Sequence, residues 1–388
     1  MHILKLSDVY FPRINGVSTS IQTFRLALAE QQVRVTVVAP QYPDSGECED
    51  VIRLPSRRVP FDPEDRLMHR DALRHLPLRL AEAGIDLVHV QTPFAAHYAG
   101  LHLARQLGVP CVTTYHTHFE EYLFHYIRFL PRAVLRSAAR RLARQQCDAL
   151  DAVIVPSRPM AETLLDYGVS APLHVIPTGL DEAQFSPGDG RRFRRDQGIA
   201  AERKIALFVG RAAFEKNIGF LLEVAALARR QRPDLLLVVA GEGPALPALR
   251  RRAAALNLQD HVRFVGYLPR ATGLKDCYAA ADLFVFASLT ETQGLVLLEA
   301  MALGVPVLAI PALGAAEIIN PRRGAVAAPN ETGGFAAELV RLLDDPRCLA
   351  ELGRQGIAFA RDWDANSQAS KLVALYRSLL PNKMELAA

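Results

Sequence analysis

The chain has 388 residues, of which 50% are hydrophobic and 22% charged, and its formal net charge is +4. This length exceeds the size at which one hydrophobic core stops growing, so we expect two domains of an ordinary, well-packed α/β protein. The five cysteines are scattered without metal-ligand spacing, which argues against a disulfide framework and predicts buried thiols in a reducing cytoplasm. No apolar run approaches the ~20 residues that cross a bilayer. The first residues lead straight into a strand pattern, so no cleavable signal is expected.

Apolar strands alternate with amphipathic helices in the first half of the chain. The predicted strands are 2–7, 33–39, 85–91, 109–115, 152–156 and 173–177. The predicted helices are 18–31, 68–83, 94–107, 131–147 and 158–167. Continuous apolar strands separated by helices indicate a parallel sheet that is covered on both faces.

The same alternation continues in the second half. Its predicted strands are 204–210, 235–240, 262–267, 282–287, 305–310 and 325–328. Its predicted helices are 217–231, 244–256, 294–303, 313–319 and 331–344, with a last helix near 364–380.

The boundary between the two halves is expected between Thr178 and Gln197, where Pro187, Gly188, Asp189 and Gly190 interrupt the periodicity. We therefore predict an N-terminal domain at 1–185, a second domain at 186–361 and a C-terminal helix at 362–388. The predicted fold class is α/β, with two doubly wound, Rossmann-like parallel sheets facing across a cleft. The carboxyl ends of their strands would line the ligand site.

The most specific stretch runs from Thr290 to Met301, behind the apolar strand at 282–287. Glu291 lies on the loop and Glu299 lies in the helix, with seven residues between them. The free N–H groups and the positive dipole end at the helix start favour a phosphate. Carboxylates on either side can accept hydrogen bonds from hydroxyls. The pattern predicts a site for a sugar, a diphosphate and a ribose in a row.

A second loop, from Gly210 to Asn217, connects a buried strand to a helix and contains Arg211 and Lys216. Two cations on one such loop can converge on a diphosphate. Lysine is scarce in this arginine-rich chain, which favours phosphate binding over the alternative of two solvated cations. We expect Asn217 to cap the following helix.

Glycine-containing loops follow other strands. Gly16 opens the first helix, where a phosphate or sugar can approach the backbone closely, although the glycine could instead only relieve strain. The loop lacks GxGxxG spacing, so a dinucleotide site is not indicated. Tyr267 and Leu268 follow a later strand and, like the turn Gly241–Pro244, could line a nucleobase pocket or form a plain turn.

The strand that ends at Tyr115 is followed by His116 and His118. An imidazole can hydrogen-bond a sugar hydroxyl or act as a general base. Two histidines at this spacing also suggest a metal, but no third or fourth ligand stands at a helpful spacing, and we predict no metal site. His116 is the better candidate because it is closer to the strand end, whereas His118 could equally be a structural histidine.

The helix after Pro131 carries arginines at every fourth position. Val134, Leu135, Ala138, Ala139 and Leu142 are expected on its buried side. No acid interrupts 122–147, so we favour contact with anionic lipid headgroups over a solvated face whose arginines pair with distant acids. The residues predicted to face the membrane are Arg128, Arg132, Arg136, Arg140 and Arg144.

Over essentially the whole chain, these motifs resemble the retaining GT-B glycosyltransferases of family 4. The Glu291–Met301 segment is the most specific element. Phe11-Pro12 with residues 16–21, Tyr115–Thr117 and Thr290–Leu295 look most like bacterial diacylglycerol glucosyltransferases. The matching segments are the Gly16 loop, Tyr115–Thr117, Ile176–Gly179, Gly210–Asn217, Gly241–Pro244 and Glu291–Met301.

The resemblance implies a nucleotide-sugar donor, with UDP-glucose as the leading candidate, held mainly by the second domain. Arg211 and Lys216 would hold the diphosphate, Glu291 the sugar and Glu299 the ribose, while His116 would lie against the transferred sugar. The last helix would cross back onto the first domain. The implied catalytic residues are His116, Arg211, Lys216 and Glu291. The implied donor-binding residues are Gly16, Arg211, Lys216, Tyr267, Leu268, Glu291, Thr292, Gln293, Gly294, Leu295 and Glu299.

In retaining transfer of this type a donor phosphate oxygen would take the acceptor proton. Stabilisation of the departing diphosphate is then the main catalytic contribution, and the two glutamates are not a glycosidase pair. No cofactor is required, although a divalent ion such as Mg²⁺ could assist without being essential.

The resemblance therefore implies a hexosyltransferase that transfers glucose from UDP-glucose to a lipid such as diacylglycerol. It would be a cytoplasmic enzyme, peripherally bound to the inner face of the cell membrane, without a nucleic acid partner. A soluble acceptor, a polysaccharide or a small metabolite, is the main alternative. A sugar-nucleotide epimerase is less favoured because only Glu120 and Glu121 stand near His116. A non-catalytic nucleotide-binding module is disfavoured because every donor-site position is filled.

Overall fold

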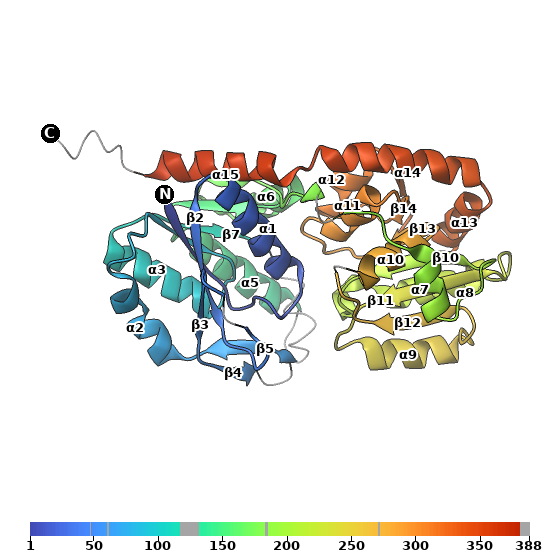
Figure 1. The fold of residues 1–388 in the computed structure, drawn as a ribbon, viewed down its shortest axis with the longest axis horizontal. Helices are drawn as coiled ribbons and strands as arrows, with labels where there is room; N and C mark the ends of the chain where they lie inside the picture. Colours follow the sequence, from blue (N-terminus) through green and yellow to red (C-terminus); the bar gives the residue numbers. More distant parts are fainter. Residues whose placement is uncertain (47, 60–61, 117–131, 183–184, 271, 381–388) are drawn as a thin grey trace. The chain divides into compact units, whose positions relative to one another are not determined.

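The chain folds into two α/β units, which the computed structural model describes over residues 1–46, 48–59, 62–116, 132–182, 185–270 and 272–380 (Figure 1). Unit 1 comprises Met1–Gly179 with Ala365–Ala388, and unit 2 comprises Leu180–Asp364. The boundaries differ slightly from the predicted 185/186 and 361/362. Leu180 belongs to unit 2 because its N–H donates to the backbone oxygen of Trp363 (2.7 Å) and because it pairs with Asp364 in a parallel bridge.

Unit 1 contains a seven-stranded parallel sheet in the order β3-β2-β1-β6-β7-β8-β9. Its strands are β1 His2–Leu6, β2 Arg34–Pro40, β3 Val51–Leu54, β6 Leu87–Val90, β7 Cys111–Thr114, β8 Ala152–Val155 and β9 Leu173–Val175. An antiparallel pair, β4 Ser56–Val59 and β5 Asp62–Met68, follows β3. The strands β3 to β5 were not predicted, because arginine, proline and aspartate interrupt any apolar run there.

Helices cover both faces of this sheet. The side chains of β1 alternate: Ile3 packs with residues of α1 and α15, whereas Leu4 and Leu6 pack with residues of α2 and α3. Tyr376 of α15 is fully buried in the first of these cores. The helices of unit 1 are α1 Gly16–Glu30, α2 Arg70–Leu80, α3 Ala95–Leu107, α5 Arg132–Cys147, α6 Arg158–Asp166 and α15 Ala365–Leu379.

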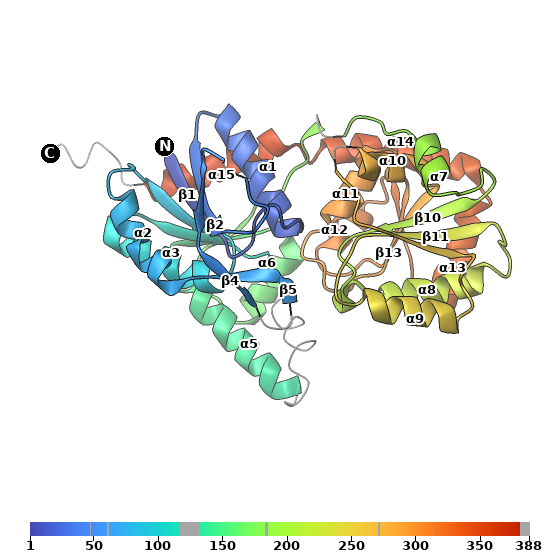
Figure 2. The ribbon, with the colours of Figure 1, turned by 60° about the horizontal axis from the view of Figure 1, so that its bottom comes forward.

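Unit 2 contains a six-stranded parallel sheet in the order β12-β11-β10-β13-β14-β15, with helices on both faces (Figures 1 and 2). Its strands are β10 Lys204–Val209, β11 Leu235–Ala240, β12 Val262–Gly266, β13 Leu283–Phe286, β14 Val307–Ala309 and β15 Ala325–Ala327. The predicted strands all occur here, with ends that differ by a few residues.

Three helices of unit 2 were not predicted: α7, α10 and α14. Asp189 caps α7 by accepting the N–H of Arg192, inside the segment that was expected to be a linker. The helices are α7 Gly190–Asp196, the short 3₁₀ helix η2 Phe214–Lys216, α8 Ile218–Ala228, α9 Leu246–Ala255, α10 Gly273–Ala280, α11 Leu295–Ala302, α12 Ala315–Ile319, α13 Thr332–Leu343 and α14 Pro346–Arg361.

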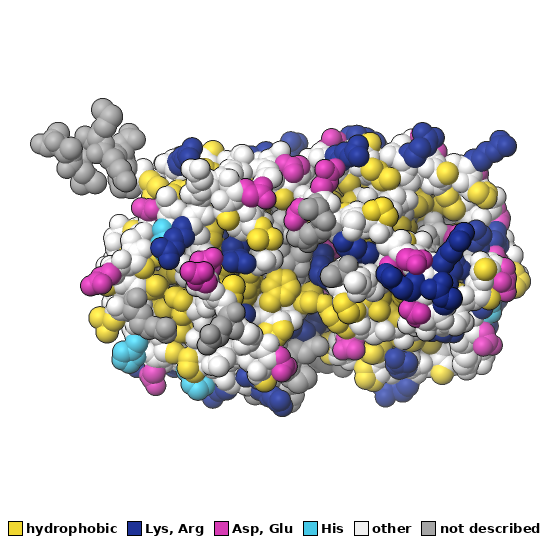
Figure 3. Space-filling view, in the orientation of Figure 1, with side chains coloured by type: hydrophobic (Ala, Val, Ile, Leu, Met, Phe, Trp, Pro, Cys, Tyr) yellow, Lys and Arg dark blue, Asp and Glu magenta, His cyan; other side chains and the backbone are white. Residues whose placement is uncertain are grey.

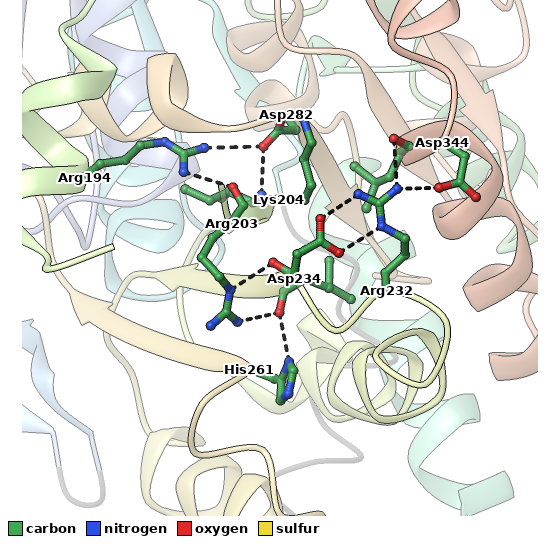
Figure 4. A network of polar contacts seen from close by, with 11 residues as sticks. Arg194, Arg203, Lys204, Arg232, Asp234, His261, Asp282 and Asp344 are labelled. Atoms are coloured by element: carbon green, nitrogen blue, oxygen red, sulfur yellow. Dashed lines mark hydrogen bonds and ion pairs between the residues drawn. The ribbon is translucent and has the colours of Figure 1, made fainter. Parts of the chain in front are cut away.

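Ion pairs and charged hydrogen bonds hold the amino ends of the unit 2 strands (Figure 4). Asp282, just before β13, accepts from Lys204 Nζ (2.9 Å) and from the backbone N–H of Ile205 (2.8 Å). Asp234, just before β11, is paired with Arg232 (2.6 Å). The Asp282 contacts connect the starts of the neighbouring strands β13 and β10, so this end of the sheet is assigned to stability.

The cysteines are free thiols with different exposure. Cys111, Cys147 and Cys277 are buried and Cys348 is half-buried, but Cys48 is exposed, so the expectation of buried thiols is wrong for Cys48. In the part of the chain that the structure describes, no helix combines the length and the apolar character that a bilayer crossing needs.

Candidate active site

The loops after β10 and β13 meet where the strand order of the unit 2 sheet reverses. β10 lies beside β13, although β11 and β12 come between them in the chain, and ligands bind beyond the strand carboxyl ends at such points. Asn217 Nδ2 donates to the backbone oxygen of Ala287 (3.2 Å), and the Ser288 hydroxyl donates to that of Glu215 (3.1 Å). Asn217 makes no side-chain cap hydrogen bond. The prediction that it caps α8 is therefore wrong, because its amide joins the two loops instead.

Lys216 and Glu291 form an ion pair across this junction, with 2.5 Å between Nζ and Oε2. Their side chains are only 23% and 18% exposed, so solvent screens their attraction less than at an open surface. Both residues were predicted to belong to a donor site, but their pairing was not predicted. The pair places a cation suited to phosphate beside a carboxylate suited to a hydroxyl.

Arg211 lies in the same loop, which packs closely against the glycine-containing turn after β11. Gly241 has φ 139°, and a Cβ there would lie 1.9 Å from the backbone oxygen of Gly210. A Cβ at Gly243 would lie 2.6 Å from the backbone oxygen of Ala212. These contacts require glycine, so the turn supports the loop that carries Arg211.

Helix α11 begins at this junction without a side-chain cap and without an acidic residue in its first turn. Gly294 precedes it with φ 95°. The Gly314 N–H donates to the backbone oxygen of Glu291 (2.9 Å), which holds the preceding loop. The first N–H groups of α11 are thus oriented for an anion. The predicted residues on this segment are Glu291, Thr292, Gln293, Gly294 and Leu295.

Glu299 is buried in α11 and contacts two polar side chains. Its oxygens pair with Arg270 and accept the Tyr278 hydroxyl (3.3 Å). The Glu299 carboxylate raises the pKa of Arg270, and burial raises the pKa of Tyr278 well above its usual value. Arg270 follows Tyr267 and Leu268 in the loop after β12. Arg270 was not predicted, because one arginine among 45 Lys and Arg residues carries no distinguishing sequence pattern.

Gly16 is the first residue of α1 in unit 1. Asn15 caps this helix by accepting the backbone N–H of Ser18 (2.9 Å). Gly16 does not have a left-handed backbone, and a Cβ there would meet no atom within 4 Å. Strain relief therefore does not explain this glycine, and close approach of a ligand to the backbone remains the better prediction.

His116 lies at the carboxyl end of β7, also in unit 1. Its Nε2 donates to Gln91 Oε1 at the end of β6 (3.1 Å). Burial of the ring, followed by the charge of Lys5, lowers the pKa of His116 to about 3, so the imidazole is neutral at physiological pH. Gln91 was not predicted to take part in the site. His118, Glu120 and Glu121 lie outside the described residues.

The basic helix α5 lies at the outer edge of unit 1 (Figure 2). Arg128 and the side chain of Arg132 lie outside the described part, whereas Arg136, Arg140 and Arg144 are exposed. Arg144 pairs with Asp148 (3.4 Å), and Arg140 lies over the Tyr167 ring (5.1 Å). The predicted buried side of the helix is partly wrong. Leu135 and Ala139 are buried, but Val134 is 53% exposed and Ala138 is exposed among the arginines.

The structure thus brings Arg211, Lys216, Glu291 and Glu299 to the carboxyl end of one sheet, while Gly16 and His116 belong to unit 1. Among the described residues, no group of three or more His, Cys, Asp and Glu side chains is arranged to hold a metal ion. Two doubly wound units, with cations and carboxylates at the switch point of the second, are the arrangement expected of a GT-B glycosyltransferase.

Comparison with known proteins identifies the family. Residues 14–184 match the model of Glycosyltransferase Family 4, and residues 189–359 match that of Glycosyl transferases group 1. The alpha-monoglucosyldiacylglycerol synthase of Streptococcus pneumoniae is 36% identical over 319 residues, which cover 80% of this chain and 71% of that protein. The chain belongs to glycosyltransferase family 4, and the predicted family and GT-B fold are confirmed.

Two further similar proteins are named for other activities. The D-inositol 3-phosphate glycosyltransferase of Pseudarthrobacter chlorophenolicus is 30% identical over 372 residues, which cover 87% of this chain and 84% of that protein. The solved structure of sucrose-phosphate synthase from Thermosynechococcus elongatus superimposes with a TM-score of 0.79 at 25% identity. The superposition covers 97% of this chain and 98% of the synthase chain. The family assignment favours group transfer over the epimerase and binding-module alternatives.

Proposed function

We propose that this glycosyltransferase transfers glucose from UDP-glucose to the hydroxyl of diacylglycerol, with retention of the α configuration. The observation that carries the proposal is the Lys216–Glu291 pair at the switch point of unit 2. The relative from S. pneumoniae supports the sugar and the acceptor, because its name specifies an alpha-glucosyl diacylglycerol product. An α product from a donor that is itself α-linked requires retention.

Unit 2 would bind the donor along the carboxyl ends of its strands. Lys216, Arg211 and the first N–H groups of α11 would neutralise the diphosphate, whose negative charge grows as the sugar leaves. Glu291 would accept hydrogen bonds from the sugar hydroxyls, next to the cation that holds the adjoining phosphate. Glu299, oriented by Arg270, would accept those of the ribose.

The route of the acceptor proton and the need for a metal ion both depend on the electrostatics of the departing diphosphate. A phosphate oxygen of the donor would take the proton of the acceptor hydroxyl, so none of the carboxylates has to act as a base. His116 is neutral and would hydrogen-bond a hydroxyl of the transferred sugar. Because protein cations and helix N–H groups stabilise the leaving diphosphate, we propose that no cofactor is required, with Mg²⁺ at most a non-essential aid.

The acceptor would be reached at an anionic membrane surface through α5, on the cytoplasmic side. Exposed arginines surround the exposed Val134 there, as in a helix that lies in the lipid interface. Lys and Arg side chains also gather over α7 in unit 2 (Figure 3). Both helices have two arginines in contacts within the fold, but the large apolar residue of α7, Phe193, is buried, whereas Val134 of α5 is exposed. We therefore assign membrane contact to α5 rather than to α7.

The reaction is tested with radiolabelled UDP-glucose and vesicles that contain diacylglycerol. The wild type should form α-glucosyldiacylglycerol, with the anomeric configuration read from proton coupling, and Glu291→Ala should not. D-inositol 3-phosphate is the soluble competitor, because a relative named for it covers most of the chain. Transfer to that acceptor but not to the lipid would contradict the proposed substrate.

Membrane contact is tested by co-sedimentation with vesicles. Changing both Arg136→Gln and Arg140→Gln should weaken binding to anionic vesicles about 30-fold, since each arginine near such a surface contributes ~1 kcal/mol. The matched control changes Arg191→Gln and Arg195→Gln in α7. An equal loss of binding in the control variant would contradict the assignment to α5.

A further inference from the structure

Two hydrogen-bonded pairs of polar side chains connect β6 and β7 in the unit 1 sheet. In the first pair, His89 Nε2 lies 2.7 Å from the Thr114 hydroxyl. In the second pair, Gln91 Oε1 lies 3.1 Å from His116 Nε2. The members of the second pair each follow those of the first by two residues. Side chains two residues apart along a strand point to the same face, so the pairs form a row that ends at the carboxyl end of the sheet.

The first pair is complete within the fold. The other ring nitrogen of His89, Nδ1, is hydrogen-bonded to the Tyr376 hydroxyl of α15 (2.6 Å). His89, Thr114 and Tyr376 are all buried, and burial lowers the pKa of His89 well below its usual value. Both nitrogens of this ring therefore have a partner within the protein. The first pair holds α15 against the sheet and has no capacity left for a ligand.

The second pair is incomplete. Gln91 is 2% exposed, and its Nε2 is a buried atom without a hydrogen-bond partner in the part of the chain that the structure describes. A buried N–H group without an acceptor is costly and rare in folded proteins. We therefore expect an oxygen atom of a bound molecule or of water to complete it. The half-buried ring of His116 lies directly beside this amide.

The contact with Gln91 also determines which nitrogen of His116 carries the proton. An amide oxygen can only accept a hydrogen bond, so the Nε2 atom that faces it is protonated. Burial, followed by the charge of Lys5, lowers the pKa of His116 to about 3. At physiological pH the neutral ring has one proton, and Nδ1 carries none. An unprotonated Nδ1 can only accept a hydrogen bond, which suits a hydroxyl group rather than a phosphate oxygen.

We propose that Gln91 positions His116 and helps to select the transferred sugar. Its Oε1 fixes the orientation and the protonated nitrogen of the His116 ring, and its Nε2 donates to a hydroxyl oxygen of the sugar. This inference rests on the proposed function, which assigns His116 to that sugar. A hydroxyl oxygen is the acceptor that the unused amide N–H requires.

The first test is independent of transfer and uses nitrogen NMR of the full-length enzyme labelled at histidine. The signals of His116 are assigned by their absence in His116→Gln. The wild-type ring should carry its proton on Nε2, and Gln91→Met should allow both tautomers because the acceptor is lost. Gln91→Glu keeps an acceptor and adds a negative charge, so it should retain the Nε2 proton and raise the pKa of His116. A group with only a structural role would not produce these changes.

The second test compares UDP-glucose with a set of UDP-deoxyglucoses, each of which lacks one hydroxyl of the sugar. With UDP-glucose, Gln91→Met should lower kcat/KM roughly tenfold, the effect of one lost hydrogen bond. With the donor that lacks the contacted hydroxyl, the same substitution should change kcat/KM less than about twofold. Gln106→Met, at an exposed glutamine of α3, is the matched control and should behave as the wild type. Melting temperatures and UDP affinities verify that each variant is folded.

The possible outcomes separate this inference from the proposed function. A wild-type ring protonated on Nδ1, or the same tautomer in wild type and Gln91→Met, would overturn the positioning role. An equal loss with every donor would mean that water completes the amide, which overturns the contact with the sugar. Both results leave transfer to diacylglycerol standing if the wild type performs it. No transfer to diacylglycerol, together with the expected change of tautomer, would overturn the acceptor and support the positioning role of Gln91.

Discussion

The two ends of the unit 2 sheet both carry ion pairs, but these pairs have different surroundings. At the amino end the charged groups bond to the backbone of neighbouring strands: Asp282 accepts the N–H of Ile205, and Arg203 donates to the backbone oxygens of Leu235 and Asp260 (2.7 Å each). At the carboxyl end Lys216 and Glu291 bond to each other, beside helix N–H groups without a side-chain cap. An ion pair alone therefore does not mark a functional site. A functional ion pair is distinguished by its position at the carboxyl ends of the strands and by neighbouring hydrogen-bonding groups that the fold does not use.

Unit 1 repeats this contrast. At the amino ends of its strands Asp86 accepts the N–H of His2 and Asp151 that of Cys111 (2.7 Å each). At the carboxyl ends the His116 ring donates to the side chain of Gln91 at the end of the neighbouring strand. We therefore expect substitutions at amino ends to change stability and those at carboxyl ends to change binding and turnover.

The largest expected effect is at the carboxyl end of unit 2. Lys216→Ala should lower kcat/KM about 1000-fold, the size seen when one preorganised group that stabilises transition-state charge is removed. The melting temperature should change little, because Glu291 is not fully buried and water can take the place of the lost ammonium group. Steady-state kinetics checks this, with Lys275→Ala in the same unit as the control. A loss of less than tenfold would contradict the role of Lys216.

The next effect is at the amino end. Asp282→Ala removes the partner of Lys204 and of the Ile205 N–H, so it should lower the free energy of unfolding by about 2 kcal/mol. The kcat/KM of the folded enzyme should stay within about threefold. Urea denaturation and kinetics on the same preparation measure both quantities. Wild-type stability with impaired turnover would contradict the assignment of the amino end of the sheet to stability.

A smaller effect is expected at Glu299. Glu299→Gln keeps the shape but removes the charge that faces Arg270, and it should raise the KM for UDP-glucose about tenfold, as expected for one charge-assisted hydrogen bond. Turnover at saturating donor should remain within about threefold. If kcat fell and KM did not, Glu299 would act on the reacting sugar rather than on the ribose.

The smallest effect concerns pH. The pKa of His116 is lowered from 6.5 to about 3, so its ring stays neutral, and its protonation should change turnover less than twofold between pH 8 and pH 6. The sign for stability follows from linkage. A buried neutral histidine stabilises the fold above pH 6.5, and this contribution is lost as the pH falls from 6.5 toward 3. A pH–rate profile of wild type and His116→Gln checks this, and a wild-type step near pH 6.5 that is absent in the variant would contradict it.

The sequence was most informative where the chain is regular. Apolar strands and periodic helices predicted both sheets, and the spacing of Glu291 and Glu299 predicted a donor site at the end of the sheet where the structure places these two residues. The polar segment from β3 to β5 has no apolar period, and α7 was hidden by prolines and glycines. Arg270 and Gln91 could not be found because their roles depend on which side chains the fold brings near them. Lys216 pairs with Glu291 because the reversal in strand order places β10 beside β13. No local sequence pattern predicts that reversal.

The central claim is that the carboxyl end of unit 2 holds the donor, and calorimetric binding of UDP and UDP-glucose tests it most directly. Lys216→Ala should weaken both ligands at least about 30-fold, since a charged contact to phosphate is lost. Glu291→Gln should weaken UDP-glucose but not UDP, and Asp282→Ala should weaken neither. Equal affinities for both ligands in wild type and Lys216→Ala would contradict the account.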